Sequence, residues 1–137
     1  MTTPCGTAEI TEITEITEII FPEHANHYGT LFGGQALQLM SKAAFLAARG
    51  ATQRDVVMAG VTDVRFLAPV PVGHVLTLRA WVSRVGRCSL TVCVTGLAQT
   101  LGSPQEDVLK GVFDMVAVDA RGRPAAIAQA YMNQEPA

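Results

Sequence analysis

The chain of 137 residues is long enough for a single domain with one hydrophobic core, and we expect residues 1–137 to form one domain. A formal net charge of −2 without a basic cluster argues against nucleic acid as a partner. No apolar run approaches the roughly 18 residues that a membrane span requires. Apolar residues at 49% of positions and a mean hydropathy of +0.28 favour an interface between subunits. Without a charged and apolar leader, a cytoplasmic location and no membrane partner are expected.

The N-terminal part predicts one short strand. Residues 1–10 form an expected frayed lead-in, and a Thr-Glu-Ile repeat follows over residues 11–19. The β-branched residues and the following Pro22 favour a strand over residues 15–21 at an edge of a sheet. We interpret the acidic residues of the repeat as a solvated face without a chemical role.

A glycine-rich turn then leads into the only long segment of helical character. Asn26, Gly29, Gly33 and Gly34 mark positions that need unusual dihedral angles or close backbone approach. Residues 35–48 are apolar on nearly every face, which predicts a helix buried on most sides and capped by the following Gly50. The free N–H groups at its start suit an anion or a polarised carbonyl oxygen.

The rest of the chain predicts strands joined by turns. They cover residues 56–67, 74–86, 87–100 and 107–119. In the second of these strands, alternation places Val85 on the face of Trp81, and Arg84 on the opposite face with Leu78. After the last strand, residues 120–124 close the sheet, and residues 120–137 are expected to form an irregular tail.

One helix followed by long strands with short connections predicts an α+β fold with an antiparallel sheet. A long antiparallel sheet wrapped around one central helix is the hotdog fold, and this is the predicted architecture.

Four blocks of the chain carry a resemblance to a known family. They are residues 26–34 (Asn-x-x-Gly-x-Leu-Phe-Gly-Gly), 66–73 (Phe-Leu-Ala-Pro-Val-Pro-Val-Gly), 84–89 (Arg-Val-Gly-Arg-Cys-Ser) and 115–119 (Met-Val-Ala-Val-Asp). Their ordered combination, within residues 17–125, resembles the hotdog-fold acyl-CoA thioesterases of the bacterial acyl-CoA hydrolase and cytosolic long-chain acyl-CoA hydrolase type. The resemblance implies hydrolysis of an acyl-CoA at a site between two subunits whose sheets join edge to edge. The implied assembly is at least a homodimer, with the tetramer and the hexamer as further alternatives.

The resemblance also implies roles for residues. Asn26 matches the turn asparagine of the family, while Gly33 and Gly34 match the glycines whose N–H polarises the thioester carbonyl. In such enzymes a helix carboxylate faces the asparagine across subunits, seven residues after the second glycine. In this chain that position is Ser41.

Ser41 leaves the general base unassigned, because a serine is not a base at neutral pH and an unassisted hydroxyl is a poor nucleophile. The predicted helix contains no acid, so the substitute bases are His27, Asp63 and Asp114. Each also has a simpler interpretation: a solvated turn histidine, an ion pair of Asp63 with Arg65, and an outward-facing strand carboxylate. Ser41 itself is interpreted as a small polar residue that lines the pocket and binds substrate or water.

Arg84, Arg87 and Ser89 flank a tight connection where the resembling enzymes place basic side chains near the CoA phosphates. Forked guanidinium donors suit phosphate oxygens, and the alternative is a pair of solvated arginines at a turn. The spacing of the histidines and cysteines predicts no metal site, and no cofactor is expected besides the CoA of the substrate.

We therefore predict an acyl-CoA thioesterase in which Gly34 holds the carbonyl oxygen, Asn26 positions water and Ser41 lines the site. The alternative is a non-catalytic acyl-CoA-binding module, which the missing carboxylate favours. A hotdog dehydratase lacks support, because neither a His-x-x-x-Phe-Pro-Gly-like signature nor a helix acid is present.

Overall fold

The computed structural model describes residues 12–127, so the predicted lead-in and the last part of the expected tail lie outside the described residues. Within residues 12–127, five strands form one antiparallel sheet in the order β1-β3-β4-β5-β2. The elements are β1 (Thr14–Ile19), a 3-10 turn (Pro22–His24), α1 (Gly33–Thr52), β2 (Asp55–Phe66), β3 (Val75–Val85), β4 (Ser89–Gln99) and β5 (Glu106–Val118).

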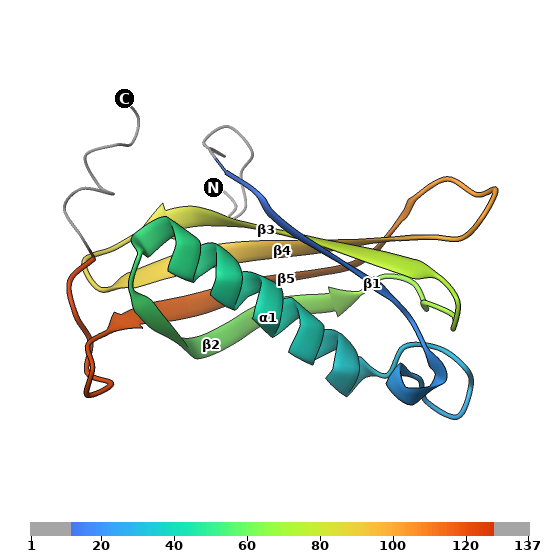
Figure 1. Ribbon diagram of the computed structural model, residues 1–137, viewed down its shortest axis with the longest axis horizontal. Coiled ribbons are helices and arrows are strands. Elements are labelled where there is room, and N and C mark those ends of the chain that lie inside the picture. The colour runs from blue at the N-terminus through green and yellow to red at the C-terminus, as the bar shows by residue number, and fades with distance from the viewer. Residues whose placement is uncertain (1–11, 128–137) are drawn as a thin grey trace.

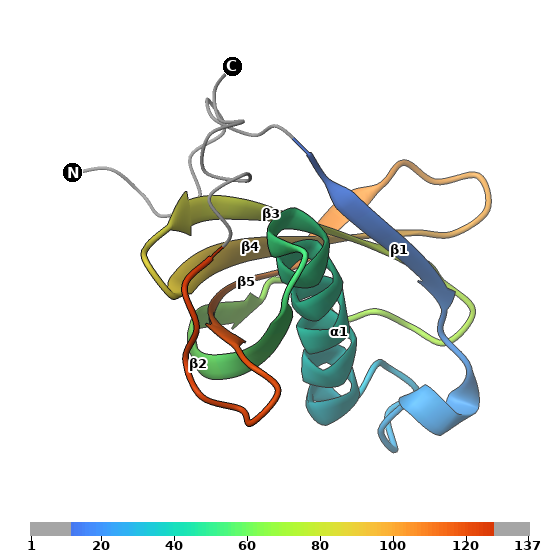
Figure 2. The same cartoon turned by 60° about the vertical axis from the view of Figure 1, so that its left-hand side comes forward.

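The sheet curves around α1, which lies across its concave face and contacts all five of these strands (Figures 1 and 2). The predicted hotdog architecture is confirmed, and each predicted strand is found within one or two residues of its expected bounds. β1 and β2 form the two edges of the described sheet. In this part of the chain, no helix is long and apolar enough to cross a membrane.

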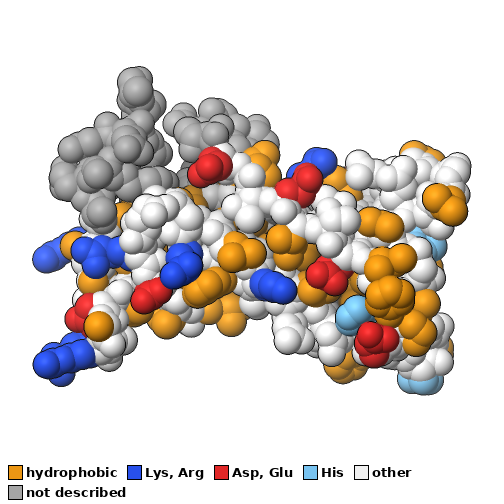
Figure 3. Space-filling model, viewed as in Figure 1, with side chains coloured by type: hydrophobic (Ala, Val, Ile, Leu, Met, Phe, Trp, Pro, Cys, Tyr) orange, Lys and Arg blue, Asp and Glu red, His pale blue; other side chains and the backbone are white. Residues whose placement is uncertain are grey.

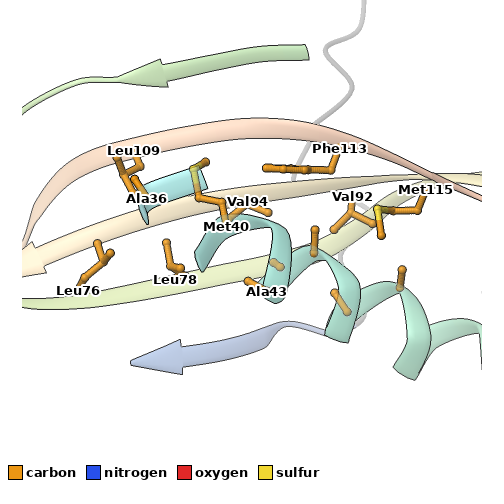
Figure 4. Close-up of a cluster of buried hydrophobic side chains, with 14 of the residues drawn as sticks. Ala36, Met40, Ala43, Leu76, Leu78, Val92, Val94, Leu109, Phe113 and Met115 are labelled. Carbon is orange, nitrogen blue, oxygen red and sulfur yellow. The ribbon is translucent and has the colours of Figure 1, made fainter. Parts of the chain in front are cut away.

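Small side chains let α1 lie close to the sheet. The buried face of the helix carries five alanines around Met40, and it packs against core residues such as Val92, Phe113 and Met115 (Figure 4). Gly111 of β5 leaves room for this contact, because a Cβ there would lie 3.0 Å from Met40 Cε. The alanines are Ala36, Ala43, Ala44, Ala47 and Ala48.

The opposite face of α1 is not buried, so the prediction of a helix buried on most sides is wrong for the single chain. Leu37, Phe45 and Leu46 are each more than one third exposed, because the sheet covers only one side of the helix. The predicted cap at Gly50 is also wrong. The helix runs on to Thr52, and Gln53 takes the left-handed conformation with φ of 56° while its N–H donates to a carbonyl of the last turn.

A β-bulge in β3 changes the predicted faces beyond Val82. Val82 pairs with Val92 and Arg84 pairs with the neighbouring Thr91, so one residue of β3 is left over. Val85 therefore packs against the core and Arg84 is exposed, the reverse of the alternation expected from sequence.

The chain after β5 forms no further helix or strand up to residue 127, but it folds back onto the sheet. Pro124 forms a bridge with Val118, and Ile127 N donates to Arg87 O (2.9 Å). The Ile127 side chain is buried in the core. The predicted closure of the sheet by residues 120–124 is thus confirmed, while residues 125–127 add contacts that the sequence did not predict.

Candidate functional site

The turn that precedes α1 is built around Asn26. Its Oδ1 accepts hydrogen bonds from Tyr28 N (2.9 Å), Thr30 N (3.2 Å) and Thr30 Oγ1 (3.3 Å). The backbone closes the same turn, because Asn26 N donates to Thr30 O (2.8 Å) and Gly29 N donates to Asn26 O (3.0 Å). Gly29 has φ of +81°, which confirms the unusual dihedral angle predicted there.

The backbone donors determine which end of the Asn26 amide is the oxygen and which is the nitrogen. Only its oxygen can accept from two backbone N–H groups, so Nδ2 points away from them. Nδ2 makes no hydrogen bond with any residue that the structure describes. Asn26 therefore offers a two-proton donor, which suits a carbonyl oxygen or the oxygen of a water molecule.

The helix α1 begins with unpaired N–H groups. Phe32 precedes it without a side-chain cap, and the first turn holds no acid. Ala36 is the first helix residue whose N–H has an acceptor, and it donates to Phe32 O at 2.9 Å. Among the described residues, the N–H groups of Gly33, Gly34 and Gln35 therefore have no hydrogen-bond acceptor.

Backbone contacts tie the Asn26 turn to the start of the helix. Ala25 and Leu31 form an antiparallel bridge, and Phe32 N donates to His24 O at 2.9 Å. As a result, Asn26 and the unpaired N–H groups lie at the same end of α1.

The close backbone approach predicted for the glycines occurs at Gly34. A Cβ there would lie 2.7 Å from Phe32 Cε2, so the aromatic ring lies directly over Gly34. Gly33 is different, since a Cβ there would be 3.9 Å from Phe66 Cζ and its φ is not positive. The Phe32 ring covers one side of the helix start and is itself about half exposed.

An apolar cavity of about 290 Å³ opens beside the same end of α1. None of its lining residues carries a charged or polar side chain. They are Leu31, Gly33, Ala36, Phe66, Leu67, Ala68, Pro69, Val70 and Leu109. Sequence reasoning missed the cavity, although residues 66–70 belong to one of the four blocks that carried the family resemblance.

Ser41 lies on the flank of α1 that faces β2, with Oγ 3.9 Å from Met58 Sδ. Leu37 and Phe45 lie four residues on either side and share this stripe of the helix. Ser41 and Gly34 are seven residues apart, or about 10 Å along a helix axis, so the two do not meet within one chain. Met58, Leu37 and Phe45 are exposed, and Ser41 thus sits in an apolar patch without a covering layer.

His27 is the substitute base that shares the Asn26 turn. It is exposed, and its ring packs against Tyr28 with ring centroids 4.0 Å apart. Asp63 lies instead on β2, where Arg65 Nε donates to Asp63 Oδ1 at 2.9 Å. The ion pair expected as the simpler interpretation of Asp63 is confirmed, and both partners are exposed.

Asp114 is kept away from the start of α1. Its neighbours Phe113 and Met115 both pack in the core beneath the helix, so Asp114 projects from the other face of the sheet. It faces Gly60 of β2 across the sheet, and its Oδ2 is 3.8 Å from the position of a Cβ there.

Arg84, Arg87 and Ser89 lie at the other end of the molecule. Ser89 pairs with the end of β5, which in turn pairs with the start of β2, directly after α1. The 20-residue helix is about 30 Å long, so these residues do not reach the start of α1 in the same chain. In Figure 3, Lys and Arg side chains gather at the left, where α1 ends, and histidines lie at the right, where it begins.

A second cavity, of about 700 Å³, occupies this arginine-rich end and was also missed by sequence reasoning. Arg49, Arg54, Asp55 and Asp119 contribute the charged side chains of its lining. Arg49 Nε lies 3.5 Å from Asp55 Oδ1, and both side chains are exposed. The lining comes from the end of α1, the start of β2 and the end of β5. The cavity therefore cannot be predicted from any single stretch of the sequence.

No group of three or more His, Cys, Asp or Glu residues within residues 12–127 could hold a metal ion. The chemistry of the described site rests on hydrogen-bond donors and apolar surface.

Comparison with known proteins gives a consistent family. The thioesterase superfamily model matches residues 28–104. An uncharacterized acyl-CoA thioester hydrolase of Zymomonas mobilis is 35% identical over 110 residues, which cover 80% of this chain and 74% of that protein. One of Bacillus subtilis is 28% identical over 109 residues, and the match covers 79% of this chain but only 63% of the longer relative.

Solved structures agree with these relatives. An acyl-CoA hydrolase variant from Staphylococcus aureus in complex with coenzyme A has a TM-score of 0.81 and 26% identity, over 84% of this chain and 70% of that chain. A hexameric thioesterase from Yersinia pestis has a TM-score of 0.80 and 27% identity, over 86% of this chain and 96% of that chain.

Proposed function

The chain belongs to the thioesterase superfamily, and from that premise we propose that it hydrolyses acyl-CoA thioesters to a carboxylic acid and CoA. The observation that carries the proposal is the start of α1. There the unpaired N–H groups of Gly33 and Gly34, the Nδ2 donor of Asn26 and an apolar cavity share one end of the helix. Relatives named as acyl-CoA thioester hydrolases support the same reaction.

In the proposed reaction, the thioester carbonyl oxygen accepts hydrogen bonds from the helix start. Attack by water forms a C–O bond and moves an electron pair onto this oxygen, where the Gly34 N–H and the positive end of the helix dipole stabilise the charge. Collapse of the intermediate breaks the C–S bond and releases CoA as a thiolate. A thiol with a pKa of about 8.5 leaves readily, so the demanding steps are activation of water and stabilisation of the oxyanion.

His27 is the substitute base that we favour for the proton of water. It belongs to the same turn as Asn26, and an imidazole nitrogen accepts a proton from water in many hydrolases. Asp63 is held by Arg65, and Asp114 projects from the far face of the sheet, so each is poorly situated in its own chain. Ser41 lines neither cavity of the single chain, so its proposed role as a polar residue of the pocket requires a second chain beside it.

A pair of chains accounts for the separation of the predicted residues. β2 is a long edge strand of the described sheet, and Val57, Met58 and Val61 on it are exposed, which favours pairing with a second copy. Antiparallel pairing of two β2 strands sets the two α1 helices side by side in opposite directions. The arginine-rich end of one copy, with Arg84, Arg87 and Ser89, then adjoins the start of α1 in its partner.

The same pairing brings a second chain against the flank of α1 that carries Ser41. We therefore propose a homo-oligomer with a dimer as its unit, and the hexamer of the Yersinia pestis relative supports a larger assembly. A cytoplasmic location is part of the same proposal.

The second candidate function is binding of acyl-CoA without hydrolysis. It is favoured by the sequence of α1, which contains no aspartate or glutamate between Gly33 and Thr52. Without a carboxylate next to the thioester, the helix supplies no group that takes the proton of water, and activation of water is weaker.

Thiol release distinguishes the two functions. Purified protein is incubated with acetyl- to palmitoyl-CoA and an aryl-CoA, and free CoA is measured with a thiol reagent, beside the His27→Ala variant. Turnover by the wild type supports hydrolysis, and a loss in His27→Ala supports His27 as the base. If no substrate is turned over while calorimetry shows that acyl-CoA binds, the hydrolase proposal is wrong and the binding module is right.

A further inference from the structure

The cavity beside the start of α1 favours an apolar occupant, because all of its lining side chains are apolar. Its nine lining residues contribute aliphatic side chains, one aromatic ring, one proline and one glycine, and none of them carries a charge or a side-chain hydrogen-bonding group. A charged or hydrogen-bonding group placed inside would lose its water without a side-chain partner to replace it. The chemistry of the lining therefore points to a hydrocarbon chain.

The cavity has a floor and a mouth. Ala36, Val70 and Leu109 are at most 3% exposed and form its buried end. Phe66 and Leu67 are about half exposed and form the open end. A chain that enters past the mouth is therefore stopped by the core of the protein after a limited distance.

Gly33 connects the cavity to the proposed reaction site, because it both lines the cavity and carries one of the unpaired N–H groups of the helix start. A thioester carbonyl held by those N–H groups would lie at the edge of the cavity, so that its acyl chain can enter the cavity. The geometry thus gives the hydrocarbon a direct path inwards.

The size of the cavity limits the length of the chain. A volume of about 290 Å³ corresponds to about ten groups of the size of a water molecule, at ~30 Å³ each. Because part of this volume lies at the open mouth, we take about eight carbon atoms as the upper limit of the chain that it can hold.

We infer that this cavity is the acyl-chain site of the enzyme and restricts efficient hydrolysis to unbranched, uncharged acyl groups of up to about eight carbon atoms, with Ala36 at its floor setting the limit. This inference rests on the proposed hydrolase function. Each methylene that enters the cavity raises kcat/KM by about fourfold, and the rise ends where the chain reaches the floor. An acyl group of the same length that ends in a carboxylate is a poor substrate, because its charge finds no partner at the floor.

The first test is a chain-length series. Thiol release is measured for acyl-CoAs from two to sixteen carbon atoms, for the wild type and for Ala36→Leu, which fills the floor. We expect kcat/KM of the wild type to rise up to about eight carbons and then level off or fall. In Ala36→Leu the break should move to shorter chains, with a loss of at least tenfold for octanoyl-CoA and less than threefold for acetyl-CoA.

A second pair of variants keeps the test valid if Ala36→Leu does not fold. Leu67→Ala opens the mouth, where the side chain is half exposed and tolerant of change, and should lower kcat/KM for octanoyl-CoA by about tenfold and that for acetyl-CoA by a smaller factor. Leu101→Ala is the matched control, because Leu101 is 99% exposed and lies in the β4–β5 connection, outside the cavity.

The outcomes separate this inference from the proposed function. If thiol is released but the wild type shows no dependence on chain length, or if Leu67→Ala loses activity equally for all lengths, the cavity is not the acyl site although the protein is a hydrolase. If no thiol is released, binding of S-alkyl-CoA thioethers is measured by calorimetry. An affinity that rises to about eight carbons and is reduced in Leu67→Ala supports the cavity even without hydrolysis, whereas an affinity independent of length overturns it.

Discussion

At the scale of single residues, Asn26 combines a structural and a chemical role that two substitutions can separate. Asn26→Asp keeps the Oδ1 acceptor for the two backbone N–H groups but replaces the Nδ2 donor by an oxygen. We expect its melting temperature to stay close to that of the wild type while kcat falls by about 10²- to 10³-fold, an effect as large as removing one donor from an oxyanion site, because the donor that positions water is lost. Steady-state thiol release and thermal unfolding measure the two effects.

Asn26→Ala is the comparison for this prediction. It removes both functions and should cost about 1 kcal/mol of the free energy of unfolding in addition to the activity, because the turn loses its side-chain acceptor. An Asn26→Asp variant with undiminished kcat would show that the Asn26 donor takes no part in the reaction.

Ser41 is the residue whose replacement tests the missing carboxylate. Ser41→Asp introduces an acid at a half-buried helix position, where the cost in stability is expected to stay below about 1 kcal/mol. We expect a rise in kcat of at least tenfold, since a carboxylate becomes available to take the proton of water. Ser41→Asn is the matched control of the same shape without the basic oxygen. An equal rate in both variants would mean that a different residue is the base.

At the scale of elements, β2 is the strand through which we expect two copies to join. Val57→Lys adds a charge to an exposed apolar position of this edge, and in a symmetric pair the two lysines repel each other. The variant should shift towards a monomer in sedimentation equilibrium and lose most of its activity. Ile19→Lys on the other edge strand, β1, is the control, because its side chain is about equally exposed. Dissociation by Ile19→Lys but not by Val57→Lys would assign the interface to β1.

The elements also show how far the sequence predicts the fold. Local sequence predicts all five described strands, since β-branched content, alternation and bounding turn residues are local properties of each segment. The bulge after Val82 is not predictable in this way, because it is a property of the pairing between β3 and β4. The end of α1 was misplaced because Gly50 is typical of a cap, whereas Thr52 Oγ1 donates to Ala48 O and the helix continues for another half turn beyond Gly50.

The apolar outer face of α1 is a second feature that local sequence does not fully predict. Leu37, Phe45 and Leu46 predict burial, but sequence does not tell which chain supplies the covering surface. The features of the candidate site fall into two groups, those that local motifs predict and those that depend on distant segments. The Asn26 turn and the glycines could be predicted from local motifs, while both cavities required knowledge of which distant segments lie together.

At the scale of the whole molecule, the site residues occupy two opposite ends, which has a kinetic consequence. Arg87→Gln should raise KM for acyl-CoA by about tenfold, the loss of one charge-assisted hydrogen bond to phosphate, with little change in kcat. The same variant should hydrolyse an N-acetylcysteamine thioester of the same acyl chain, which has no phosphates, as well as the wild type does.

Arg79→Gln is the control for Arg87→Gln, because Arg79 is partly exposed and forms an ion pair with Glu15 on the neighbouring strand β1. If KM for the N-acetylcysteamine thioester rises as much as KM for acyl-CoA, Arg87 acts on the fold rather than on the phosphates. Raised salt should increase KM of the wild type for acyl-CoA more than KM of Arg87→Gln, in which Arg84 still faces the phosphates.

The order of strands in the sheet has a consequence for how the protein is made. β2 pairs with β5, the last strand of the described chain, and about 40 residues separate the end of β2 from the start of β5. At ~5–20 residues per second, a growing chain displays β2 for several seconds with neither of its edges paired. The apolar side chains through which we propose that two copies join are thus exposed on the ribosome well before the sheet can close, and nascent chains of this protein should recruit holding chaperones during that interval.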